Sequence, residues 1–230
     1  MLQENAFTGL LFLIAIWLNS PTMLLGSLIA TLSGLAAAKA CKLKISSQHS
    51  GLYGFNAVLV GLVISYYLPV NFISLTLVVL SGVLATVLMY LMITRLTDIP
   101  ALTTPFILTS WLILMLIEHI GISREVHSAF SDANSMTIVD YALASLRGIA
   151  QVMLQDYWFS GALIFCALAY NSAKTAVCAL LGSALGTLIA LCCNFSQEVI
   201  LMGGYGFNSC LVSIALTSLY PRKYWLTLLG

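Results

Sequence analysis

Two short motifs contain the residues whose types and spacing point most clearly to chemistry. The first is Gly51-Leu-Tyr-Gly-Phe-Asn-Ala-Val-Leu-Val-Gly61, and the second is Gly203-Gly-Tyr-Gly-Phe-Asn-Ser-Cys-Leu-Val212. Each motif places a phenylalanine and a leucine four residues apart, which puts both on one face of a helix. Each also places an asparagine in an apolar segment, where its amide needs polar partners or a cavity. A single copy is typical of small-residue helix packing with a satisfied asparagine; two copies favour a functional interpretation.

Catalytic and metal-binding groupings are weak by comparison. Glu118 and His119 adjoin at a predicted helix end, a place more typical of a hydrated or packing role than of a proton relay. Ser50 follows His49, but adjacent residues rarely face each other on a helix and so do not supply a nucleophile with its base. The six cysteines include no C-x-x-C spacing, which indicates small side chains compatible with lipid. We expect no enzyme, no metal site and no cofactor.

The composition indicates whether the chain folds in water or in a lipid bilayer. Of its 230 residues, 60% are hydrophobic and only 7% are charged, against about 25% charged in soluble domains. A net charge of +1 provides no basic surface for nucleic acid. The sequence therefore predicts an all-α polytopic protein whose partner is the lipid bilayer, with room for about seven to nine crossings.

Hydropathy divides the chain into helices separated by short polar segments. The predicted helices span residues 7–18, 21–40, 51–67, 70–93, 104–121, 158–170, 174–193 and 203–220. The polar stretch 122–140 is predicted to be an extramembrane connector. Residues 141–155 are moderately apolar and too short to span, which predicts a re-entrant segment.

Basic residues predict the orientation. A cytoplasmic N-terminus with one crossing per helix places seven of the nine lysines and arginines inside; Arg124 and Arg147 are the exceptions. The compact loops suggest a bacterial protein, so we expect a multi-pass protein of the cell inner membrane.

An internal repeat runs through the sequence at one ungapped offset of 152 residues. The offset pairs Met1–Gly9 with Met153–Gly161, Asn19-Ser20 with Asn171-Ser172, Gly34 with Gly186, and Tyr53–Asn56 with Tyr205–Asn208. Because five predicted crossings separate the copies, the two copies face opposite ways across the bilayer. Inverted repeats are common in transporters, whose substrate site lies near the midplane. This arrangement favours transport over catalysis.

The motifs closely resemble those of the urea transporter family. Besides the two motifs above, the resemblance rests on Ile99-Pro-Ala-Leu-Thr-Thr-Pro-Phe106, on Arg147-Gly-Ile-Ala-Gln151 and on Phe159-Ser-Gly161. It implies inverted-topology repeats of five transmembrane helices around a narrow pore, and a homotrimer with one pore per subunit. The first repeat would comprise 1–121 and the second 141–230.

The resemblance also implies a set of pore residues. These are the slot aromatics Phe55 and Phe207, the neighbouring Asn56, Leu59, Asn208 and Leu211, the midpoint hydroxyl of Thr103, and Gln151 with Leu154 at one mouth. Leu154 stands where the family usually has an aromatic residue, which would soften the stacking wall. A flat, neutral solute such as urea would pass edge-on between the rings, its amide groups bonding to the few oxygens.

The repeat predicts a truncated second copy. At the same offset, the counterpart of Gln151 would fall at −1 and that of Thr103 at 255, outside the 230 residues. We expect passive, channel-like urea transport. The alternatives are a non-conducting truncated homologue or assembly subunit, or a channel for ammonia or short amides.

Overall fold

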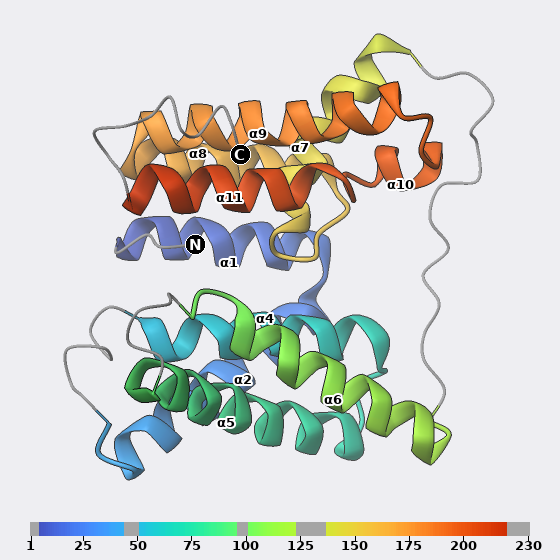
Figure 1. The fold of residues 1–230 in the computed structure, drawn as a ribbon. Coiled ribbons are helices and arrows are strands. Elements are labelled where there is room, and N and C mark those ends of the chain that lie inside the picture. Colours follow the sequence, from blue (N-terminus) through green and yellow to red (C-terminus); the bar gives the residue numbers. More distant parts are fainter. Residues whose placement is uncertain (1–4, 44–50, 96–100, 123–136, 220–230) are drawn as a thin grey trace. The chain divides into compact units, whose positions relative to one another are not determined.

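The computed structural model describes residues 5–43, 51–95, 101–122 and 137–219, and all regular structure in these ranges is helical (Figure 1). The helices are α1 (Ala6–Asn19), α2 (Pro21–Ala40), α4 (Leu52–Tyr67), α5 (Phe72–Arg95), α6 (Thr104–Ile120), α7 (Ile138–Gln151), α8 (Trp158–Asn171), α9 (Ala173–Cys192), α10 (Gln197–Leu201) and α11 (Gly206–Leu219). Every predicted helix is present, most with ends within two residues of the predicted ones. The predicted helical class is confirmed.

Two predicted segments differ in detail from the structure. The predicted helix 203–220 is preceded by a short helix, α10, and α11 begins only at Gly206. Gly203 separates them because its φ of 80° lies in the left-handed region, which ends a helix. The predicted re-entrant segment contains α7, which begins at Ile138, inside the predicted connector. The connector residues 123–136 lie outside the described ranges.

Four stretches among the described residues are long and apolar enough to cross a membrane. They are Pro21–Ala40, Phe72–Arg95, Ala173–Cys192 and the α10–α11 stretch Gln197–Ser218. Shorter apolar helices are Ala6–Asn19, Tyr53–Tyr67, Thr104–Ile120 and Trp158–Asn171. A helix of 20 residues is about 30 Å long, which matches the hydrocarbon core of a bilayer.

The chain forms two compact units. One unit, Ser20–Val126, contains α2, α4, α5 and α6 and is called the α2–α6 unit. The other, Met1–Asn19 with His127–Gly230, contains α1 and α7 to α11 and is called the α1/α7–α11 unit. The first helix of the chain therefore packs with the helices of the second half.

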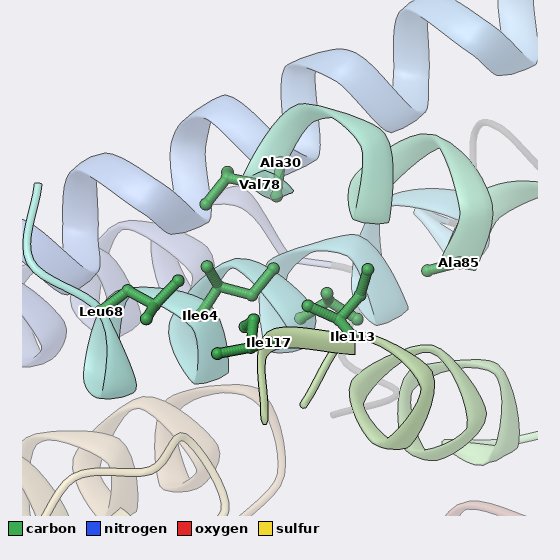
Figure 2. Packing of buried hydrophobic residues seen from close by; sticks show 8 residues of the cluster. Ala30, Ile64, Leu68, Val78, Ala85, Ile113 and Ile117 are labelled. Carbon is green, nitrogen blue, oxygen red and sulfur yellow. The ribbon is translucent and has the colours of Figure 1, made fainter. Parts of the chain in front are cut away.

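The α2–α6 unit is built around α4, whose side chains form a core with all three other helices. The cluster comprises Ala30, Val60, Ile64, Leu68, Val78, Ala85, Ile113 and Ile117 (Figure 2). Glycines let the helix backbones approach closely. A Cβ atom on Gly61 would meet the backbone of Gly26, and one on Gly82 would meet the backbone of Ala30. Close packing of small residues is typical of helix association in membranes, because the hydrophobic effect does not drive association between helices that are surrounded by lipid.

The α1/α7–α11 unit is held together by similar close contacts. A Cβ atom on Gly148 of α7 would meet Ser183 of α9 and the backbone of Gly206 of α11. The Ser183 hydroxyl also donates a hydrogen bond of 2.6 Å to the carbonyl of Ser145. Packing and hydrogen bonding thus fix α7 against both α9 and α11.

Local conformations recur at the offset of 152 residues. Ser20 caps α2 and Ser172 caps α9, each accepting a hydrogen bond from the backbone N–H three residues later. Past the end of each helix, Lys42 has φ 51° and Asn194 has φ 54°. These matching caps and turns do not depend on the hydrophobic pattern.

Helices α1 and α8 contact each other through a reciprocal pair of hydrogen bonds. The Thr8 hydroxyl donates to the Ala167 carbonyl at 3.2 Å, and the Ser160 hydroxyl donates to the Ala15 carbonyl at 2.9 Å. Thr8 and Ser160 are 152 residues apart, as are Ala15 and Ala167. The start of α1 therefore meets the end of α8, so the helices are antiparallel. Reciprocal contact of this kind is what a two-fold axis produces.

Candidate functional site

Helix α4 carries three of the predicted site residues on its first two turns. Gly51 precedes the helix with a φ of 67°, and its carbonyl accepts a hydrogen bond of 3.1 Å from the backbone N–H of Phe55. The side chain of Phe55 is half-buried, whereas Leu59 is 3% exposed. The two residues that the helical spacing places on one face therefore differ in exposure.

Asn56 lies between them and is completely buried. Its Nδ2 donates to the Leu102 carbonyl at 3.1 Å, and its Oδ1 accepts from the Phe106 N–H at 3.0 Å. The sulfur of Met89 lies 3.7 Å from Nδ2. Both ends of the Asn56 amide therefore bind backbone groups of the segment before α6. Asn56 joins α4 to the segment that leads into α6.

This segment presents Thr103 directly before α6. Leu102 has a φ of 40°, a left-handed conformation that is costly for a leucine. Thr103 is half-buried and occupies the N-cap position of α6, yet its side chain makes no capping hydrogen bond. Because Asn56 bonds to Leu102, which adjoins Thr103, the structure brings the predicted residues Phe55 and Thr103 to one region of the α2–α6 unit.

The other predicted residues belong to the α1/α7–α11 unit. Gln151 is the last residue of α7 and is half-buried. Leu154 is also half-buried and has a φ of 57°. Its backbone N–H donates to the Gln151 carbonyl at 2.9 Å, so a tight turn holds the two residues together.

Helix α11 carries the second aromatic motif. Phe207 and Leu211 are half-buried, whereas Asn208 is exposed. The close approach of Gly148 to Gly206 brings the start of α11 against α7. The second asparagine thus differs from Asn56, although the surrounding motif is almost the same.

Two further polar residues lie in the α7 region, and the sequence motifs gave neither of them a role. Arg147 donates from Nη1 to the Leu201 carbonyl at 3.0 Å, which ties α7 to the end of α10. Gln155 is completely buried; its Nε2 donates to the Met153 carbonyl at 2.6 Å, and its Oε1 has no hydrogen-bond partner. The repeat contained a signal for Gln155, because the 152-residue offset pairs it with Gln3.

The beginning of α7 carries a charged cap. The backbone N–H and hydroxyl of Thr137 donate to the Asp140 carboxylate at 2.8 and 2.7 Å. These hydrogen bonds hold the pKa of Asp140 below its ordinary value, and the positive charge of Arg147 lowers it further. This carboxylate lies at the N-terminal end of α7, outside the candidate membrane spans, where its negative charge stabilises the helix.

The site residues are neutral in both units. Phenyl rings, amides and one hydroxyl can bind a small, uncharged and polar molecule, but they do not balance the charge of a dehydrated ion. Within the described ranges, no group of three histidine, cysteine or acidic side chains is placed to hold a metal ion.

Apolar helices of spanning length, joined by short polar segments, define a multi-pass membrane protein. The sequence matches the family model "Urea transporter" over residues 1–230. The chain therefore belongs to the urea transporter family, a family of transporters rather than enzymes.

Similar proteins include mammalian members of that family. The chain is 26% identical over 242 residues to urea transporter 1 of Mus musculus, and 25% identical over 242 residues to that of Ovis aries. In both comparisons the match covers 97% of this chain and 62% of the relative. The chain thus spans less than two thirds of the length of these curated relatives.

Proposed function

We propose that this protein conducts urea passively across a membrane, through a narrow pore lined by aromatic rings and a few neutral polar groups. The observation that supports this best is the arrangement around Asn56 in a chain of the urea transporter family. There the half-buried ring of Phe55 and the hydroxyl of Thr103, which makes no capping bond, are held in one region by hydrogen bonds from the buried Asn56 to the backbone.

The chemistry of urea suits these groups. Urea is planar and uncharged, so it fits edge-on beside the face of a phenyl ring without the cost of burying a charge. Its amide N–H groups lose water on entry and need oxygen acceptors in exchange. The Thr103 hydroxyl and the side-chain carbonyl of Gln151 are such acceptors. Ions would find no opposite charge to offset their dehydration.

We further propose that the chain contains inverted-topology repeats, with α1, α2 and α4 corresponding to α8, α9 and α11. The antiparallel, reciprocal contact of α1 with α8 supports an axis perpendicular to these helices. The matching caps and turns at the 152-residue offset support it independently. Phe207 and Leu211 would then serve the second copy as Phe55 and Leu59 serve the first.

The remaining features of the proposal follow from the resemblance and from charge. The protein would lie in a cell inner membrane with its N-terminus in the cytoplasm, because this orientation places most basic residues inside. It would assemble as a trimer with one pore per subunit. Exposed apolar side chains such as Leu32, Trp111 and Met115 are surfaces that lipid or a neighbouring subunit would cover.

The proposal is tested by reconstituting the chain into liposomes and following urea entry by stopped-flow light scattering. Passive conduction predicts faster urea entry than in empty liposomes, at equal rates in either direction and without a proton or sodium gradient. A urea permeability equal to that of empty liposomes contradicts the proposal and favours the non-conducting alternative.

The residue assignments are tested in the same liposomes. Thr103→Val keeps the shape of the side chain but removes the acceptor, and it should slow urea entry. Thr104→Val is the matched control, because Thr104 is exposed on the next position and is not assigned to the pore. Phe55→Ala should admit larger amides by widening the slot. Wild-type rates and selectivity in both Thr103→Val and Phe55→Ala would refute the assignments.

A further inference from the structure

The first turn of α6 contains a backbone N–H group, that of Phe106, that needs an acceptor from outside the helix. The first N–H groups of a helix have no partner within the helix, and a threonine at the N-cap normally accepts a bond from the second or third residue. Here the N-cap is Thr103, and the second helical residue is Pro105, which has no N–H. The N–H of Phe106 is therefore the group that the Thr103 hydroxyl would be expected to bind.

In the structure that N–H binds elsewhere. The Phe106 N–H donates to Asn56 Oδ1 at 3.0 Å, and the Thr103 side chain makes no capping bond. The other end of the same amide holds the Leu102 carbonyl at 3.1 Å. Asn56 thus binds the backbone on both sides of Thr103, from a helix about 50 positions earlier in the chain.

We propose that Asn56 is a positioning residue that caps α6 in place of Thr103, and thereby keeps the Thr103 hydroxyl available to the solute. This inference rests on the proposed function, which identifies the solute as urea. A hydroxyl committed to the Phe106 N–H would offer urea one acceptor position fewer and a fixed direction. Asn56 removes that competition and also holds Leu102 in its left-handed conformation, which sets the direction in which Thr103 points.

The motif alone does not produce this role. Asn208 occupies the same place in the second motif, but its side chain is exposed. The difference comes from the backbone against which Asn56 lies, because the segment Leu102–Phe106 supplies one acceptor and one donor at the spacing of a single amide. Asn56 is completely buried, so it acts on the solute only through the groups that it holds.

The test is a double-mutant cycle with two readouts. The variants are Asn56→Ala, Thr103→Val and the combination of both, each reconstituted as the full chain. One readout is urea permeability. The other is hydrogen exchange at the Phe106 amide, followed by NMR on protein labelled with ¹⁵N-phenylalanine. Exchange reports whether the amide has a partner and does not depend on urea conduction.

In the double variant, the loss of permeability should be smaller than the two single losses combined, whereas the loss of exchange protection should be larger. Each single variant should reduce urea permeability by up to about tenfold, which is the change in rate that the free energy of one hydrogen bond produces. The double variant should be no slower than the slower single variant. Exchange at Phe106 should remain slow in both single variants, because either Thr103 or Asn56 still caps the amide. Only the double variant should lose this protection.

Different failures are distinguishable. Multiplied permeability losses in the double variant, or complete loss of protection in Asn56→Ala alone, would overturn the positioning role. If the wild-type chain does not conduct urea, the proposed function fails, and the exchange cycle still decides whether Thr103 replaces Asn56 as the cap. Combined with Thr103→Val, Asn56→Asp provides a second variant: it keeps an acceptor for the Phe106 N–H at a helix start that favours negative charge, although it loses the donor to the Leu102 carbonyl. Exchange at Phe106 should therefore be slower in this double variant than in Asn56→Ala with Thr103→Val, and equal exchange in the two would also contradict the proposal.

Discussion

Replacing Thr8 by valine and Ser160 by alanine removes the two hydroxyls that join α1 to α8. Both side chains are buried, at 1% and 0% exposure, and each donates to a carbonyl of the other helix. Interhelical hydrogen bonds of this kind contribute about 0.6 kcal/mol on average in membrane proteins. We therefore expect each variant to lower the free energy of unfolding by about 0.6 kcal/mol.

The two sites lie at opposite ends of the helix pair and share no partner, so their effects should add to about 1.2 kcal/mol in the double variant. Reversible unfolding in mixed micelles with SDS, followed by circular dichroism, measures this cost. Thr76→Val is the matched control, because the Thr76 hydroxyl is exposed and bonds within its own helix to Phe72. Costs for Thr8→Val and Ser160→Ala no larger than for the control would refute the interhelical contact, and strongly unequal costs would refute its two-fold character.

Three further predictions concern the backbone, the charged cap of α7 and the topology. Gly203→Ala should be far more destabilising than Gly51→Ala in the same unfolding assay: both glycines have positive φ, but a Cβ atom on Gly203 would meet the backbone of α7, whereas one on Gly51 would meet nothing within 4 Å. Equal losses would contradict the packing of the turn between α10 and α11 on α7. The pKa of Asp140 is lower in the folded than in the unfolded chain, so its ionised carboxylate stabilises the fold at pH values above its unfolded pKa. This contribution should disappear as the pH falls through the folded pKa, and Asp140→Asn should lack it. If the free energy of unfolding depends on pH in the same way in Asp140→Asn and the wild type, the contribution is excluded. Cys41 and Cys193 are exposed after α2 and α9, and inverted repeats predict that a membrane-impermeant thiol reagent labels single-cysteine versions of them from opposite sides. Labelling from the same side would contradict the inverted topology.

The bounds of α2 and α6 were predictable because each helix begins or ends at a recognisable local signal. Ser20 with Pro21 begins α2, and Gly121 with a φ of 76° ends α6. Such signals act over a few residues, so they can be read from one sequence. The division into compact units was not predictable in this way, because the contact of α1 with α8 joins residues more than 140 positions apart.

The sequence indicated which candidate residues share a helix face, but not which groups they contact. The spacing of Phe55 and Leu59 predicted a shared face, and the structure buries Leu59 more deeply because neighbouring helices cover α4 along its length. The role of Asn56 depends on the groups at Leu102 and Phe106, which lie 46 and 50 residues away. A motif can indicate that a buried amide needs partners, but only the fold shows which backbone groups satisfy it.

The most direct test of the central claim compares urea with glycerol in the same liposomes. Both solutes are small and uncharged, but glycerol is not planar, so a slot between aromatic rings should discriminate between them. The account predicts that the reconstituted chain raises the permeability to urea above that of empty liposomes and raises that to glycerol much less. No increase for urea, or an equal increase for both solutes, would contradict it.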